Sequence, residues 1–187
     1  MTRPAARDED VGDRDGNVGD RDEDGGGRDR DPAGRPRNAR PRDALGRPLR
    51  RGADGETPPP DEPALTPDAA LDLAQQLIDS GLAFRAHEVL EASWKAAPPG
   101  ERDLWQGLAQ VAVGLTHAQR GNARGAAALL RRGGRRVAGY AHGPAPHGIG
   151  AEEVARFAAD LADRIERDGL VAASPDDFRV TLRADGR

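Results

Sequence analysis

The sequence predicts an all-α protein, in which a compact bundle of about five helices, built from antiparallel helical hairpins, follows a disordered N-terminal arm. Three observations lead to this prediction. Apolar residues recur at helical spacing from about residue 66 to residue 169, glycines and prolines interrupt the pattern, and the preceding residues offer almost nothing for a core. We therefore divide the 187 residues into an arm (1–65), a helical domain (66–169) and a C-terminal tail (170–187).

The arm is rich in Arg, Asp, Gly and Pro and contains no aromatic residue. Because its few aliphatic side chains cannot offset the entropy lost on ordering a backbone, we expect residues 1–65 to be disordered. Its block 32–52 holds seven Arg and one Asp, a composition that could contact nucleic acid or an acidic surface. Acidic blocks flank this block and no aromatic can stack on bases, so the sequence favours a solvated tail over a nucleic-acid partner.

Start and stop signals divide the domain into helices. Thr66 is a good N-cap, Pro67 suits the first helical position, and Gly81 is a natural C-cap, which predicts a first helix between them. We expect further helices at about 83–97, 101–120, 123–138 and 151–168, with Asn122 capping the fourth and Gly133-Gly134 weakening it midway. A short extended piece is expected at 178–182.

An internal similarity supports the hairpin arrangement. Residues 80–90 ("SGLAFRAHEVL") and 120–130 ("RGNARGAAALL") align, and both read as a helix end, a glycine turn and a new helix. The matched positions are Gly81 and Gly121, Ala86 and Ala126, and Leu90 and Leu130. Stacked helical hairpins have this pattern, and two such units are enough for a compact bundle of antiparallel neighbours.

The predicted third helix is the most informative segment. Residues 104–119 ("LWQGLAQVAVGLTHAQ") contain no charged side chain, which indicates a helix buried on nearly all sides. Gly107 and Gly114 lie on one side of it and would let a neighbouring helix approach closely. The segment is too short and too polar to span a membrane, and no signal-peptide pattern is present, so we expect a cytoplasmic protein without membrane contact.

Polar residues on this helix share one edge. Gln106, Gln110 and His117 fall within a narrow strip at helical spacing, and buried amides and imidazoles need hydrogen-bond partners. The second helix offers His87 and Glu91, which are four residues apart and can point to one spot. Such a cluster could hold a metal, shuttle protons or lock two helices together.

Ordered motifs in this region resemble the domain-of-unknown-function family 309, over about residues 77–140. They are a His-Glu-x-x-Glu-x-x-Trp segment, a Gln-Gly-x-x-Gln helix and a His before a Gly-Asn turn. The matching residues are His87, Glu88, Glu91 and Trp94; Gln106, Gly107 and Gln110; and His117, Gly121 and Asn122. The resemblance implies an all-helical bundle. Some members of the family carry the automatic label "predicted metal-dependent hydrolase".

Two hypotheses of different classes follow, and the sequence leaves open whether the protein is an enzyme. In a metal-dependent hydrolase, His87, Glu91 and His117 would bind a divalent metal with one position left for water, and Glu88 or Glu91 would be the general base. In a non-catalytic protein-interaction module, the same cluster would be a structural hydrogen-bond network. That network, or a small-ligand pocket, would include Gln106, Gln110, Asn122 and Trp94.

Other candidate sites are weaker. The absence of cysteine excludes disulfides, thiolate metal sites and Cys nucleophiles, and no phosphate-binding loop or Ser/His/Asp order is present. The cluster from Arg131 to Arg136 reads more readily as a solvated helix end than as a phosphate or RNA site. His142 and His147 flank "GPAP" in a loop, where we expect histidines without a role rather than metal ligands.

Overall fold

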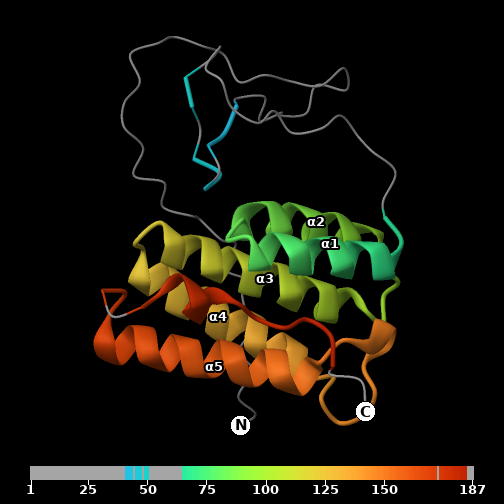
Figure 1. Ribbon diagram of the computed structural model, residues 1–187. Helices are drawn as coiled ribbons and strands as arrows, with labels where there is room; N and C mark the ends of the chain where they lie inside the picture. Colours follow the sequence, from blue (N-terminus) through green and yellow to red (C-terminus); the bar gives the residue numbers. More distant parts are fainter. Residues whose placement is uncertain (1–40, 44, 48, 51–64, 172, 185–187) are drawn as a thin grey trace, which may run out of the picture. The chain divides into compact units, whose positions relative to one another are not determined.

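The computed structural model describes residues 41–43, 45–47, 49–50, 65–171 and 173–184. Within these residues the chain forms five α-helices, which confirms the predicted all-α fold (Figure 1). They are α1 (Pro67–Asp79), α2 (Ala83–Ala96), α3 (Arg102–Gln119), α4 (Ala123–Ala138) and α5 (Ala151–Asp168). Short 3-10 turns, η1 (Pro146–Gly148) and η2 (Pro175–Phe178), precede and follow α5. Most of the predicted disordered arm lies outside the described residues.

Consecutive helices are the packing neighbours in this bundle. The main helix–helix contacts join α1 with α2, α2 with α3, α3 with α4 and α4 with α5. Figure 1 shows the result, with α3 lying between the pair α1 and α2 and the pair α4 and α5. A chain of hairpins therefore builds the bundle, and its middle helix is enclosed by the others.

The two hairpin turns have the same hydrogen bonds, which explains the internal similarity of the sequence. At the end of α1, Gly81 takes φ 76°, its amide donates to Ile78 O and the next amide, Leu82 N, donates to Leu77 O. At the end of α3, Gly121 takes φ 80° and the same two bonds recur. This double bond pattern is the Schellman motif, and its left-handed residue is best supplied by glycine.

The uncharged helix α3 carries the centre of the core. Leu104, Leu108 and Leu115 are almost completely buried, and so is Trp105. Thr116 is buried as well, and its hydroxyl donates to the carbonyl of Ala112 at 2.9 Å, so its polar group is satisfied within the helix. The burial of α3 on nearly all sides matches its lack of charge.

Glycines bring α3 and α4 together. A Cβ added to Gly107 would lie 3.0 Å from Gly133 O, and one added to Gly133 would lie 2.7 Å from Gly107 O. The next glycine, Gly134, faces α5 instead, where a Cβ would lie 3.0 Å from Ala158 Cβ. The helix α4 runs without a break through both glycines, contrary to the expected weakening, because this pair is buried between two neighbours.

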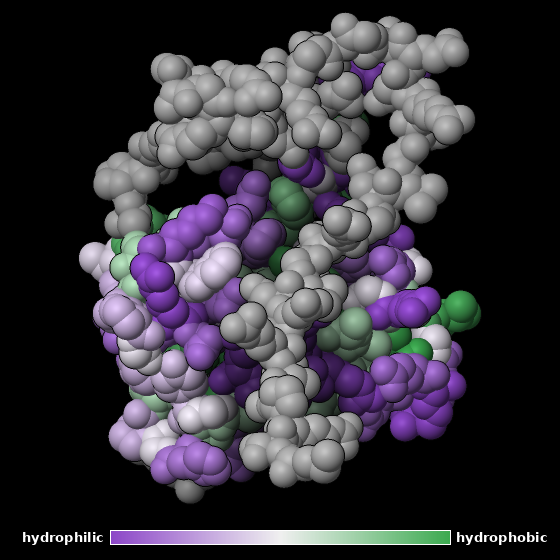
Figure 2. Space-filling model, turned by 180° about the vertical axis from the view of Figure 1, so that it is seen from behind, coloured by the Kyte–Doolittle hydropathy of each residue, from purple (hydrophilic) through white to green (hydrophobic). Residues whose placement is uncertain are grey.

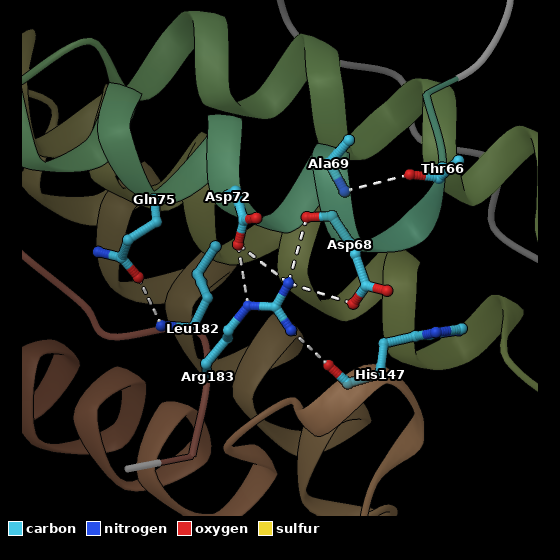
Figure 3. A network of polar contacts seen from close by, with 8 residues as sticks. All are labelled: Thr66, Asp68, Ala69, Asp72, Gln75, His147, Leu182 and Arg183. Carbon is cyan, nitrogen blue, oxygen red and sulfur yellow. Dashed lines mark hydrogen bonds and ion pairs between the residues drawn. The ribbon is translucent and has the colours of Figure 1, made fainter. Parts of the chain in front are cut away.

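The C-terminal tail ties α1 to the loop before α5 (Figure 3). Its extended piece begins after Phe178, and the side chain of Gln75 donates to Val180 O at 3.0 Å and accepts from Leu182 N at 2.8 Å. Arg183 then donates to Asp72 at 3.0 Å and to the carbonyl of His147 at 2.8 Å, and also bonds Asp68. The tail thus joins segments that are distant in the sequence.

The surface seen in Figure 2 is largely hydrophilic, and its hydrophobic residues form small, separate patches. The exposed large apolar residues among those described are Leu65, Leu73 and Val171. None of the five helices combines the length and the apolar character needed to cross a bilayer.

Replacing Gly133 with alanine tests the close approach of α3 and α4. Its Cβ would meet two backbone atoms of α3, Gly107 O and Val111 N, which cannot rotate away. Overpacking costs about 1–3 kcal/mol and exceeds the gain of roughly 1 kcal/mol that alanine brings to a helix, so we expect a lower free energy of unfolding. Urea denaturation of the full chain measures it. Gly100→Ala is the control, because open space surrounds that position; equal stability of both variants would contradict the close approach.

Candidate functional site

The predicted pair on α2 lies at the edge of the bundle. The imidazole Nε2 of His87 is 3.9 Å from Glu91 Oε2, and the other carboxylate oxygen of Glu91 is 3.0 Å from Lys95 Nζ. The side chain of His87 is 24% exposed and that of Glu91 is 36% exposed. Glu91 is therefore shared between two basic groups, of which the lysine is the closer.

The imidazole of His87 sits in an environment that favours its neutral form. Its Nδ1 is buried and has no hydrogen-bond partner among the described residues. Burial lowers the pKa of His87, Glu91 opposes this, and the positive charges of Lys95 and Arg120 lower the pKa further. The ring of Phe84 meets the imidazole edge to face, with 6.1 Å between the ring centroids.

The polar strip of α3 is divided between two environments. Gln106 and Gln110 are half-buried, and Gln110 Oε1 is buried without a hydrogen-bond partner in the described part of the chain. His117 lies at the other end of the strip, where its Nδ1 is 2.8 Å from the side-chain amide nitrogen of Asn122. The oxygen of that amide accepts from Gly125 N at 2.9 Å and caps α4, so His117 contributes to the cap.

Gly125 makes room for this arrangement, and sequence reasoning did not identify it. A Cβ at position 125 would lie 2.4 Å from His117 Nδ1 and 2.6 Å from the side-chain amide nitrogen of Asn122. A glycine three residues after an N-cap asparagine is the signal that could have indicated it.

The three predicted metal ligands are not grouped together in this structure. Among the residues described, no group of three or more histidines and acids is placed so that it could hold a metal ion. His87 and Glu91 approach one another, whereas His117 takes part in the cap of α4. The other predicted residues of the site are half-buried on α2: Glu88, and Trp94, which packs against the core.

A cluster that the sequence did not reveal lies beside His87. The ring of Phe84, at the start of α2, lies beside two guanidinium groups, with Arg42 Cζ 5.3 Å and Arg120 Cζ 5.5 Å from its centroid. Arg120, at the end of α3, also donates to the carbonyl of Leu45 through Nε at 2.8 Å and through Nη2. Because residues 1–65 were expected to be disordered, no contact between them and α2 or α3 was predicted.

Arg120 is held in a partly desolvated position. Burial lowers the pKa of its guanidinium, Asp43 opposes this, and Arg42 and Arg47 lower it further. Three guanidiniums and one carboxylate therefore meet at the contact between residues 42–47 and the bundle. We call the surface formed by Phe84, His87 and Arg120 the α2–α3 face.

A second polar cluster lies at the opposite end of α3. His147 Nε2 is 2.8 Å from Glu101 Oε2, and the indole nitrogen of Trp105 donates to the same oxygen at 3.2 Å. The hydrogen bond with His147 lowers the pKa of Glu101. His147 has φ 58°, the one positive φ of a non-glycine residue in the described chain. His147 is therefore bonded to the carboxylate of Glu101, whereas the sequence analysis expected a loop histidine without a role.

The basic cluster on α4 is partly neutralised. Arg131 bonds Asp163 and Glu166 on α5, each at 2.6 Å, and Arg136 bonds Asp103 on α3 at 2.6 Å. These two guanidiniums join α4 to both of its neighbours.

Comparison with known families identifies the central part of the chain. Residues 71–129 match the model of the domain of unknown function DUF309. The family resemblance is therefore confirmed, over a segment that begins within α1 and ends within α4. The chain is similar to the uncharacterised protein YpuF of Bacillus subtilis (strain 168), with 46% identity over 48 residues. That match covers 25% of this chain and 28% of the relative. No solved structure matches the chain.

Every residue of the α2–α3 face lies within the DUF309 match, whereas Arg42 and Leu45 lie outside it. The face therefore lies within the segment that matches DUF309, and the segment that contacts it belongs to the preceding arm.

Replacing His87 tests whether folding favours the neutral form of its imidazole. Because folding lowers its pKa, the unfolded chain binds a proton more readily than the folded chain as the pH falls below about 6.5, the ordinary histidine value. The contribution of His87 to stability is complete above that pH and decreases as the pH falls toward the folded pKa. We expect the melting temperature of the wild type to fall more steeply between about pH 7.5 and pH 5.5 than that of His87→Gln.

His142→Gln, at an exposed loop position, controls for the loss of an imidazole. Differential scanning calorimetry over the same pH range measures all three proteins. If the His87→Gln protein kept the full pH dependence of the wild type, the environment described for this imidazole would be wrong.

Proposed function

We propose that the DUF309 domain is a non-catalytic binding module that takes a segment of protein chain on its α2–α3 face. One observation carries the proposal: the guanidinium of Arg120 donates to the main-chain carbonyl of Leu45, which belongs to a segment far away in the sequence. The face therefore already has one chain segment docked on it.

The chemistry of the face suits a peptide. A guanidinium that donates to a main-chain carbonyl fixes the position of a chain whatever side chain that residue carries. Charge-assisted hydrogen bonds of this kind are stronger than neutral ones, and partial burial strengthens them further. Next to it, the ring of Phe84 offers an aromatic face on which cationic or small groups can stack.

His87 packs against this aromatic ring. Its neutral imidazole lies edge to face with Phe84, and the opposing positive charge of Arg120 disfavours its protonation. The histidine predicted from the sequence thus has a role in the module without any reaction. It holds the ring in place rather than providing a base.

The hydrolase hypothesis has one favourable observation, the neutral imidazole of His87 at 3.9 Å from Glu91. A neutral imidazole can bind a metal or accept a proton. Against it, Glu91 lies closer to Lys95 than to His87, and the described residues offer no third ligand. The binding module needs none of these groups to act chemically, and we therefore prefer it.

The experiment is quantitative affinity purification with the full chain. Proteins recovered with the wild type should fall about tenfold or more with Arg120→Ala, because truncating a charged hydrogen-bond partner at an interface costs about 2–5 kcal/mol and every 1.4 kcal/mol is tenfold in affinity. Arg135→Ala, at an exposed position of α4, is the matched control and should recover the same proteins as the wild type. Helical circular dichroism checks that each variant is folded.

Two results would count against the module. Recovery that does not depend on Arg120 would remove the α2–α3 face from the interaction. Stoichiometric zinc, manganese or iron in the purified wild type, lost in a folded His87→Ala protein, would instead support the metal-dependent hydrolase.

A further inference from the structure

The docked segment has a defined local structure. Gly46 N donates to Asp43 O at 2.8 Å, Asp43 N donates to Arg47 O at 3.0 Å, and the Asp43 carboxylate accepts from Leu45 N and Arg47 N at 3.0 and 2.7 Å. Leu49 N also donates to Pro41 O at 2.8 Å, so Pro41 and Leu49 approach one another. An aspartate that accepts from its own following amides is a common way to stabilise a turn.

Glycine is required where this turn meets the bundle. Gly46 is buried, it has φ 75°, and a Cβ at this position would lie 2.3 Å from Cγ of Phe84. Any other residue would be strained in its backbone and would collide with the ring. The turn can approach the ring of Phe84 closely because Gly46 has no side chain.

Arg42 completes the contact. Its guanidinium donates to Gly46 O at 2.6 Å while it stacks over Phe84, so one side chain holds the turn closed and attaches it to the face. The docked unit is therefore an arginine that precedes a left-handed glycine by four residues, with an aspartate between them. We call this unit, whose described residues are 42–43 and 45–47, the arginine turn.

We infer that the arginine turn is a built-in competitor for the α2–α3 face, and that an external partner displaces it by presenting the same chemistry. This inference rests on the proposed binding module and names the partner: a protein segment with an arginine four residues before a glycine in a tight turn. The face belongs to the DUF309 domain and its present occupant belongs to the arm, as expected of a ligand supplied by the same chain.

Attachment to the same chain favours the occupied state. A segment joined by a short linker has an effective concentration of roughly millimolar at its binding site. Residues 51–64 join the arginine turn to the residues preceding α1, so an external segment with the same contacts must overcome this advantage. The apparent affinity of the face for that segment is reduced by the fraction of molecules in which the face is open.

The experiment uses a fluorescent synthetic peptide of residues 39–52 and the full chain, with anisotropy as the readout. In Gly46→Ala the arm cannot dock, because of the positive φ and the collision with Phe84. This variant should bind the peptide at least tenfold more tightly than the wild type. Gly100→Ala adds the same methyl group where nothing lies within 4 Å, and should bind the peptide as the wild type does.

The double variant Gly46→Ala with Arg120→Ala should lose peptide binding at least tenfold relative to Gly46→Ala, with its helical circular dichroism retained. Suppose that the wild type and Gly46→Ala bound the peptide equally well, and that binding to both required Arg120. The arginine turn would then not compete for the α2–α3 face, whereas the proposed binding module would still hold. Failure of every variant to bind the peptide would overturn the arginine turn as a ligand. The proposed binding module would then be tested by the affinity purification described above, in which the recovery of proteins should require Arg120.

Discussion

The close approach of α3 and α4 is the constraint on which the rest of the bundle depends. Gly107 and Gly133 place the two backbones so near each other that neither position has room for a Cβ. This contact places α3 in the middle of the bundle, with α2 on one side and α4 on the other. The positions of both polar clusters follow, because each lies at one end of α3: Arg120 at its C-terminal end and Glu101 at its N-terminal end.

Much of this fold could be predicted from the sequence because its signals are local. Thr66 and Asn122 cap helices with their side chains, and Gly81 and Gly121 end them with the same pair of hydrogen bonds. Such devices act within a few residues, and a sequence displays them directly. The continuity of α4 through Gly133-Gly134 could not be predicted in the same way. Whether a glycine pair interrupts a helix or allows close packing depends on which neighbours approach it.

The candidate site was less predictable because its contacts are not local. The spacing of His87 and Glu91 fixes them on one face of a helix, whereas the assignment of His117 to the same cluster assumed that the strip on α3 points as a whole toward α2. Asn122 instead offers His117 a nearby partner in the same turn. The contact of Leu45 with Arg120 joins residues 75 positions apart, and composition alone favoured disorder for that segment. Turn chemistry around Asp43 and Gly46 was the available signal, and it acts against that composition.

Hydrogen exchange of the native protein tests the central role of α3 most directly. Amides in the core of a domain exchange only on global unfolding, whereas those of outer elements open locally. The account predicts that the amides from Leu108 to Leu115 exchange most slowly, with an opening free energy equal to that of global unfolding. It also predicts that α1 and α5, at the two ends of the chain of hairpins, open at lower free energy. Exchange in α3 as fast as in α5 would show that α3 is not the enclosed centre of the bundle.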